Sequence, residues 1–276
     1  ASCHYPYEGI NKMTHGIRKG EIVTITAGAG IGKSQVCREL ANHILNQEET
    51  IGYIALEESN KRTGLGFMGL YLNKPLHLGN AEVSEEEFKE AFDNTLDTGK
   101  IFMYDHWGSL QGDNLLSKIR YMASACGCGY IILDHISIVV SGIEEGDERR
   151  TIDNLMTKLR GLVEEVNCGL ILVSHLKRPQ GNKGHEDGAQ TSMAQLRGSA
   201  SIGQLSDIVI GCERDQQGEE PDRTTVRVLK NRWTGETGIA CSLDYDHATG
   251  RLTEIQTDEI PFEDETSEWS GESTNF

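Results

Sequence analysis

Apolar runs of strand length alternate with longer amphipathic stretches along most of the chain. The short runs predict strands at 21–27, 51–56, 100–105, 130–134, 170–174 and 206–213. Apolar residues at helical spacing predict helices between them, at 34–47, 61–72, 84–97, 112–125 and 151–167. Because short apolar strands that alternate with helices are typical of a parallel sheet covered on both faces, the pattern predicts an α/β fold with a mainly parallel sheet.

The pattern changes after residue 213. Segments with alternating apolar and polar residues, separated by turns that contain Gly or Asp, lie at 224–233, 237–246 and 251–255. Alternation is typical of strands with one exposed face, so we expect antiparallel strands at one edge of the sheet. Residues 1–256 are therefore predicted to form one domain, and the acidic segment 257–276 a disordered tail.

Two segments between these elements are predicted to be mobile loops. Residues 141–150 follow the strand predicted at 130–134, and residues 177–190 follow the strand predicted at 170–174. In open parallel sheets, ligands bind beyond the carboxyl ends of the strands, where both loops emerge.

The composition is typical of a globular protein. The chain has 276 residues, 37% of them hydrophobic, which is too apolar for a disordered chain. No stretch approaches the roughly 18 apolar residues of a membrane span, and the N-terminus lacks the features of a secretory signal. Since the sequence starts with Ala1, we expect it to be part of a longer chain. The seven cysteines, with one close pair at Cys126 and Cys128, favour reduced thiols over a zinc or redox site.

Net charge alone does not identify a partner. The formal charge is −17, but residues 257–276 carry seven acidic side chains and no Lys or Arg, which leaves −10 on residues 1–256. The distribution of charge therefore matters more than its sum when nucleic-acid binding is considered.

A glycine-rich segment follows the first predicted strand and opens the first predicted helix. It reads AGAGIGKS and departs from the pattern G-x-x-x-x-G-K-S/T only where Ala27 replaces the first glycine. Glycines let backbone N–H groups approach a polyphosphate, and the helix N-terminus adds partial positive charge. Lys33 is predicted to reach the β- and γ-phosphates, and Ser34 to hold Mg²⁺. The predicted nucleoside triphosphate contacts are Ala27, Gly28, Ala29, Gly30, Ile31, Gly32, Lys33, Ser34 and Gln35.

Three residues at the ends of other predicted strands are candidates to complete this site. Asp134 is the candidate carboxylate for Mg²⁺, although an Asp in this position is often only a turn residue. Glu57 is the candidate general base for water, with Glu58 as a competitor that we expect to be a solvated neighbour. His175 is the candidate sensor of the γ-phosphate, whereas most isolated histidines have a structural role.

Several segments in a fixed order resemble one family. They are AGAGIGKS, IALEES, YIILDHISIVV, NLMTKLRG, LILVSHLKRP, QLRGSASIGQLSD, CERDQQGE and LKNRWTGETGIA. Together they resemble the helicase domain of the replicative primase–helicases of short-tailed bacteriophages, which belong with the DnaB-like hexameric helicases. The resemblance implies a RecA-like P-loop NTPase core in a ring, usually of six subunits, which uses ATP or dTTP with Mg²⁺. Such rings translocate on single-stranded DNA and unwind duplex DNA at the replication fork.

The resemblance also implies residue roles. The three strand-end residues named above look like the family's catalytic glutamate, its Mg²⁺-associated carboxylate and its γ-phosphate sensor. Arg232 falls where the family has an arginine finger that enters the neighbouring subunit's site, and Lys230 lies two residues before it. Arg214 and Tyr245 match positions that contact the nucleotide, Tyr245 by stacking on the base.

The implied DNA contacts come from loops that line the central channel of the ring. The matching positions are Lys177, Lys183, Arg197, Gly198 and Gln204. Six subunits that each contribute one or two cations would form a positive ring inside an acidic particle. Because these loops contain no aromatic residue, backbone tracking is favoured over base stacking.

The acidic tail carries a further implied contact. In this phage family an acidic tail with a terminal aromatic residue docks on the replicative DNA polymerase, and Phe276 resembles that anchor, with Trp269 seven residues before it. A merely solubilising tail is the alternative. The resemblance implies action in the cytoplasm of a phage-infected bacterial host, without a membrane partner.

The sequence departs from the family in two respects. It contains no primase or zinc-binding module. Residues 1–20, which include Pro6 and three glycines, do not match the upstream helix that packs on the neighbouring subunit. We therefore predict that this chain alone assembles poorly, and stable hexamers at micromolar concentration in sedimentation would contradict this.

Two other classes of protein stay open on the sequence. A RecA-like recombinase shares the phosphate loop and the sheet, but it forms an open filament and exchanges strands rather than unwinding a fork. A non-motor binding or loading module, or an NTPase without unwinding activity, is the second. A non-motor module would show little stimulation of hydrolysis by single-stranded DNA, whereas a helicase would show strong stimulation.

Overall fold

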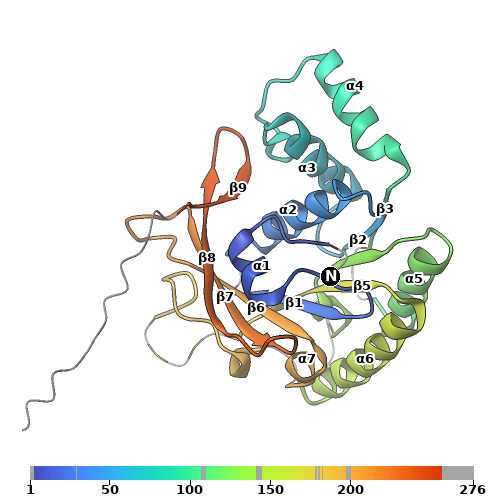
Figure 1. Ribbon diagram of the computed structural model, residues 1–276, viewed down its shortest axis with the longest axis vertical. Helices are drawn as coiled ribbons and strands as arrows, with labels where there is room; N and C mark the ends of the chain where they lie inside the picture. Colours follow the sequence, from blue (N-terminus) through green and yellow to red (C-terminus); the bar gives the residue numbers. More distant parts are fainter. Residues whose placement is uncertain are drawn as a thin grey trace, which may run out of the picture.

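A nine-stranded sheet forms the centre of the computed structural model (Figure 1). The structure describes residues 3–28, 30–106, 110–140, 145–177, 179, 181, 183–196 and 200–256. The strands are β1 (Ile22–Ala27), β2 (Ile51–Ala55), β3 (Ile101–Asp105), β4 (Tyr130–Asp134), β5 (Gly169–His175), β6 (Ile208–Arg214), β7 (Arg223–Asn231), β8 (Gly238–Asp246) and β9 (Arg251–Glu254). Their order is β3-β2-β4-β5-β1-β6-β7-β8-β9. The first six strands are parallel, and β7 to β9 extend one edge antiparallel, as the hydrophobic pattern predicted.

Helices cover both faces of the sheet. They are α1 (Glu8–Thr14), α2 (Lys33–Leu45), α3 (Asn60–Leu72), α4 (Glu85–Asn94), α5 (Gly112–Ser124), α6 (Glu145–Val166) and α7 (Ala200–Leu205). One buried core joins the sheet to α1, α2 and α3, and a second core joins its other face to α5, α6 and α7. Figure 1 shows these helices on the two sides, with α4 standing outside α3. No helix in the described part of the chain is both long and apolar enough to cross a membrane.

The strand register aligns the carboxyl ends of four parallel strands in two pairs. Ala27 at the end of β1 pairs with His175 at the end of β5. Ala55 at the end of β2 likewise pairs with Asp134 at the end of β4. Residues that end these strands, or that follow them directly, therefore lie near one another at the carboxyl ends of the parallel strands.

Helix α6 starts earlier than the sequence suggested. Residues 141–150 were expected to be a mobile loop, but residues 145–150 belong to α6, and residues 141–144 lie outside the described residues. Acidic residues near a helix N-terminus are favoured by its dipole, and Asp147 and Glu148 stand there. The charged residues of this segment, which suggested a solvated loop, are thus compatible with the first turns of a helix. The prediction was wrong because it relied on apolar spacing, which begins only at Ile152.

Two short helices were not anticipated from the sequence. The first, α1, packs on β8, and a Cβ atom at Gly9 would lie only 2.1 Å from the carbonyl oxygen of Ala240. The second, α7, has six residues and is held at its C-terminal end by side chains from β7 and beyond. Helices this short have little stability on their own, so tertiary contacts decide whether they form. The seven cysteines are all free, as expected.

Candidate nucleotide-binding site

The phosphate loop lies between the end of β1 and the start of α2. Gly30 and Gly32 have positive φ angles of 73° and 101°, a backbone conformation that only glycine adopts readily. Ala27, which replaces the first expected glycine, is the last residue of β1 and is fully buried in the core, so a methyl group is accommodated there. Ala29 lies outside the described residues. The loop therefore keeps glycine where its backbone turns.

Lys33 is directed into this loop. Its Nζ donates hydrogen bonds to the carbonyl oxygens of Gly28 at 2.9 Å and Ala27 at 3.4 Å. Burial lowers the pKa of Lys33, although the negative charge of Asp134 acts in the opposite direction. The loop carbonyls therefore hold the Lys33 cation inside the predicted phosphate loop.

Ser34 and Asp134 meet beside the loop. The Ser34 Oγ donates a hydrogen bond of 2.9 Å to Asp134 Oδ2. Burial raises the pKa of Asp134, although the Ser34 hydrogen bond and the positive charge of Lys33 act in the opposite direction. A hydroxyl and a carboxylate side by side are hard oxygen ligands of the kind that Mg²⁺ takes at phosphate sites. The two residues predicted to hold the metal thus lie together, although they are 100 positions apart in the sequence.

Asp134→Asn is expected to stabilise the nucleotide-free protein. It is also expected to abolish the Mg²⁺-dependent hydrolysis of a nucleoside triphosphate. Because burial raises the pKa of Asp134, the charged carboxylate costs stability at pH 7, and asparagine removes this cost. We expect the thermal midpoint to rise by roughly 2–4 °C, the shift that 1 kcal/mol produces in a domain of about this size. The gain should shrink as the pH falls through the raised pKa, where the native carboxyl is already protonated. Asp244→Asn, on the exposed face of β8, is the control and should change neither property.

Glu57 faces two histidines. Its Oε1 lies 2.9 Å from Nε2 of His135, and the rings of His135 and His175 stand edge to face at 4.1 Å. Ligand atoms of the three residues lie within 4.8 Å of one another. Burial alone would raise the pKa of Glu57, but the adjacent His135 ring, with His175 and Lys33 nearby, lowers it overall. The carboxylate is therefore ionised at neutral pH and, with 63% of its side chain exposed, can accept a hydrogen bond from water.

His135 was missed by the sequence reasoning. It follows Asp134 directly, in the motif that supplied the metal candidate, and this adjacency is the signal that could have found it. Its side chain is nearly buried, so it holds Glu57 from the protein side while the carboxylate stays open to solvent.

Glu58 is not the solvated neighbour that we expected. Ser59 directly follows Glu58 and caps α3 by accepting a hydrogen bond from Arg62 N. Glu58 lies 3.3 Å from Arg38 Nη1 and 3.5 Å from Arg62 Nε, and only 14% of its side chain is exposed. The structural role of Glu58 in these ion pairs leaves Glu57 as the carboxylate open to water.

A pocket of about 240 Å³ connects these groups. Its lining residues are Ser34, Arg38, Ala55, Glu57, Glu58, Arg62, His77 and Asp134. Burial, together with Arg38 and Arg62, lowers the pKa of His77 to about 4, so His77 is neutral at physiological pH. Arg38 was not predicted as a site residue, although it lies one helical turn after Ser34.

Three of the predicted nucleotide contacts lie near β8 and β9. Arg214 Nη2 lies 3.5 Å from Asp222 Oδ1, and the backbone N–H of Tyr245 donates to the carbonyl of Asp222. Gln35 Nε2 donates a hydrogen bond of 3.0 Å to the carbonyl of Gly250, in the turn between β8 and β9. Asp222 thus brings Arg214 and Tyr245 together, and Gln35 ties the phosphate-loop helix to the same antiparallel strands.

Arg232 lies at the amino ends of the parallel strands, on the side of the sheet away from the phosphate loop. Its backbone N–H donates to the carbonyl of Asp207, whose own N–H donates to the carbonyl of Ile22 at the start of β1. The phosphate loop begins only after Ala27, and strand residues rise by about 3.3 Å each, so β1 separates the two places by roughly 17 Å. This separation is greater than the length of an arginine side chain. Arg232 therefore does not complete the site of its own chain.

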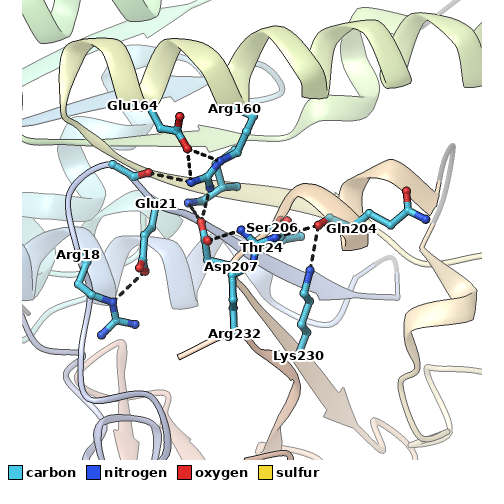
Figure 2. Close-up of polar contacts among 12 residues, drawn as sticks. Arg18, Glu21, Thr24, Arg160, Glu164, Gln204, Ser206, Asp207, Lys230 and Arg232 are labelled. Carbon is cyan, nitrogen blue, oxygen red and sulfur yellow. Dashed lines mark hydrogen bonds and ion pairs between the residues drawn. The ribbon is translucent and has the colours of Figure 1, made fainter. Parts of the chain in front are cut away.

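Figure 2 shows the cluster that holds the predicted finger. Arg232 Nη1 contacts Asp207 Oδ1 at 2.9 Å, and its Nη2 donates to the carbonyl of Gln204 at 3.2 Å. Asp207 is buried and also accepts hydrogen bonds from Arg160 and from the backbone of Ile22. The Arg232 guanidinium is therefore paired within its own chain, although half of the side chain stays exposed.

Lys230 contacts the same helix end. Its Nζ donates to the carbonyl oxygens of Gly203 at 2.7 Å and Gln204 at 3.0 Å (Figure 2). Cations at a helix C-terminus are favoured by the helix dipole. In its own chain Lys230 thus caps α7, and its predicted nucleotide contact stays a prediction.

The predicted DNA contacts are only partly described. Lys177 and Lys183 are exposed, and the exposed side chain of Gln204 points away from Lys230 and Arg232 (Figure 2). Arg197 and Gly198 lie outside the described residues, and so does Phe276 with the rest of the predicted tail at 257–276.

The fold and the site together define a P-loop NTPase of the RecA-like class. The sequence matches the family of DnaB-like helicase C-terminal domains over residues 4–254, and the chain belongs to this family. It is 41% identical over 250 residues to the DNA helicase/primase of Enterobacteria phage T3, a match that covers 89% of this chain and 44% of that protein. The chain therefore spans less than half the length of this relative.

Solved structures agree on the fold. One solved ATPase domain superimposes with a TM-score of 0.74 at 18% identity, and the match covers 91% of this chain and 90% of that domain. A DnaB-like replicative helicase, solved in a study of its interactions with primase, superimposes with a TM-score of 0.73 at 17% identity. This second match covers 91% of this chain and 61% of the helicase. The α/β architecture with antiparallel strands at one edge is therefore the architecture of this class.

Proposed function

We propose that this chain is the motor domain of a replicative DNA helicase. It hydrolyses ATP or dTTP in a ring, usually of six copies, and moves along single-stranded DNA to unwind the duplex at a replication fork. The membership in the DnaB-like family and the 41% identity to the T3 DNA helicase/primase support this proposal. The single observation that carries it is the division of the site between the two edges of the sheet.

The division makes hydrolysis depend on a neighbour. Lys33, Ser34, Glu57 and Asp134 lie at one edge, and Arg232 is held by Asp207 at the other. In a ring, the Arg232 edge of one subunit would face the phosphate-loop edge of the next. A protomer then lacks the cation that stabilises the charge of the transition state until it assembles.

Mg²⁺ fits the donor set at the phosphate loop. Ser34 and Asp134 are the residues that would hold it, since their hydroxyl and carboxylate oxygens already lie side by side. When bound, the ion supplies charge neutralisation of the β- and γ-phosphates. Glu57 orients and deprotonates water, His135 fixes the Glu57 carboxylate, and His175 lies next to both as the contact for the γ-phosphate.

DNA is proposed to bind on the loops that follow β5 and precede α7, together with α7 itself. Lys177 and Lys183 carry the exposed cations, Gln204 adds a polar side chain, and Arg197 and Gly198 complete the set. Cations on a ring-lining loop neutralise backbone phosphates, so binding should weaken as salt rises. We propose further that Phe276 docks the acidic tail on the replicative DNA polymerase. The proposed location is the cytoplasm of the infected host.

Hydrolysis measured with and without single-stranded DNA tests the function. In the native chain that contains this domain, we expect turnover of ATP or dTTP to rise several-fold with oligothymidylate and a forked duplex to be unwound in one direction. Lys33→Ala is the control and should abolish both activities, because the phosphates lose their cation. Strand exchange in place of unwinding would indicate a recombinase. Turnover that is indifferent to DNA would indicate a binding or loading module.

A further inference from the structure

Two short loops contact the phosphate loop, and the proposed site uses neither of them. We call them the loop pair, residues 184–188 and residues 215–217. The backbone N–H of Gln216 donates a hydrogen bond of 2.9 Å to the carbonyl of Glu186, and Asp187 and Asp215 form an antiparallel bridge. The loop pair is therefore one hydrogen-bonded unit built from two distant parts of the sequence.

The first contact of the loop pair with the phosphate loop is polar. Gln216 Nε2 donates a hydrogen bond of 2.7 Å to the carbonyl oxygen of Gly30. In a trans peptide the C=O and the following N–H point in opposite directions, so this bond turns the N–H of Ile31 away from Gln216. Phosphate loops bind polyphosphate through such backbone N–H groups. Gln216 thus fixes the orientation of one of the groups on which phosphate binding depends.

The second contact is steric. His185 is only 6% exposed and packs on Gly28, where an added Cβ atom would lie 2.3 Å from the Cβ of His185. Residue 28 must therefore be glycine to keep this contact. The His185 ring also donates from Nε2 to the carbonyl of Lys177 at 3.1 Å, since a carbonyl can only accept. His185 links the backbone of the phosphate loop to Lys177, the second residue after β5.

The other end of the loop pair meets the predicted DNA contacts. Lys183 precedes it directly and is exposed, and Lys177, whose carbonyl binds His185, is exposed as well. A DNA phosphate bound by either lysine would lie within a few residues of both contacts. His185 and Gln216 of one chain thus connect the proposed DNA site with the phosphate loop, through packing and hydrogen bonds.

We propose that Gln216 and His185 are positioning residues that transmit DNA binding to the phosphate loop. DNA held by Lys177 and Lys183 fixes the loop pair, and the loop pair then holds Gly28 and Gly30 in the shape that binds and cleaves the triphosphate. The mechanism rests on the proposed function, because it explains how single-stranded DNA would stimulate hydrolysis. It assigns to the loop pair a role inside one subunit, separate from that of Arg232 between subunits.

A pair of neighbouring glutamines provides the test. Gln216→Glu replaces the donor with a carboxylate that faces the Gly30 carbonyl, whereas Gln217→Glu makes the same charge change at the adjacent, exposed residue. In the native chain, we expect Gln216→Glu to raise the KM for MgATP or MgdTTP at least fivefold and to reduce the stimulation by oligothymidylate at least fivefold. Gln217→Glu should leave both within twofold. Where Gln216→Glu disturbs folding, Gln216→Ala against Gln217→Ala makes the same comparison.

His185 is tested by a conservative rescue. His185→Ala removes the packing on Gly28 and the bond to Lys177, while His185→Gln keeps an N–H at nearly the same distance from the backbone. We expect stimulation by oligothymidylate to fall at least fivefold in His185→Ala and to return to at least half of its native value in His185→Gln. Affinity for oligothymidylate, measured by fluorescence anisotropy, should stay within twofold in all variants.

Four results would overturn the inference. They are native KM and stimulation in Gln216→Glu, equal losses in Gln216→Glu and Gln217→Glu, a parallel loss of oligothymidylate affinity, and no difference between His185→Ala and His185→Gln. The proposed function fails in a distinguishable way. If the native chain shows no stimulation by DNA, the helicase motor is contradicted, and an unchanged KM in Gln216→Glu separately contradicts the phosphate-loop contact.

Discussion

Arg232→Ala is expected to lower NTP turnover of the assembled ring by roughly 10³–10⁵-fold, the range known for arginine fingers. Arg232 is anchored by Asp207 about one strand length away from the phosphate loop of its own chain, so its guanidinium can act only on a nucleotide bound by another copy. The measurement is steady-state hydrolysis with oligothymidylate, at a concentration where sedimentation shows the ring to be intact. Arg223→Ala, a half-exposed arginine at the start of β7, is the matched control and should retain native turnover.

Mixed rings make this expectation sharper. Rings that combine Arg232→Ala chains with Glu57→Gln chains contain some interfaces in which Glu57 comes from one chain and Arg232 from the other. Such interfaces are intact only if the finger acts between subunits, so turnover should reappear on mixing two inactive variants. Arg232→Ala chains mixed with chains that carry both substitutions form no intact interface and should stay inactive. Absence of recovery in the first mixture, with subunit exchange verified, would contradict the assignment.

The second large effect is expected at Glu57. Glu57→Gln should lower kcat by roughly 10²–10⁴-fold, the contribution of a positioned general base, while KM changes little. The reason is that glutamine keeps the size of the side chain and can still contact His135, but it cannot accept a proton. Turnover of MgATP or MgdTTP with oligothymidylate measures the loss.

Glu58→Gln is the control for Glu57, because it makes the same change at the next residue. It removes the charge that pairs with Arg38 and Arg62. We expect it to retain most of the turnover, because Glu58 takes no part in the activation of water. A larger loss of kcat in Glu58→Gln than in Glu57→Gln would exchange the roles of the two carboxylates.

The errors of the sequence reasoning have a common cause. The parallel strands were predicted to within a few residues because each is a compact apolar run, and β7 to β9 because their apolar and polar residues alternate. The first turns of α6, the short helices α1 and α7 and the ion pairs of Glu58 escaped because charge and helix propensity do not show what a segment will contact. The sequence predicted Glu58 to be a surface residue beside Glu57, whereas the fold places Arg38 of α2 in contact with it.

The amino-acid sequence alone determined the parallel sheet, the phosphate loop and the strand-end residues Glu57, Asp134 and His175. Short segments of sequence were enough for this inference, because the carboxyl ends of parallel strands all lie on the same side of a sheet. Only the tertiary structure decided that Arg232 lies at the amino ends of the parallel strands and that Gln216 donates a hydrogen bond to Gly30. It also decided that His135 holds Glu57. Each of these contacts joins residues from separate elements of the fold, and no local pattern of hydrophobic and polar residues records which distant side chains the packing of a sheet and its helices will bring together.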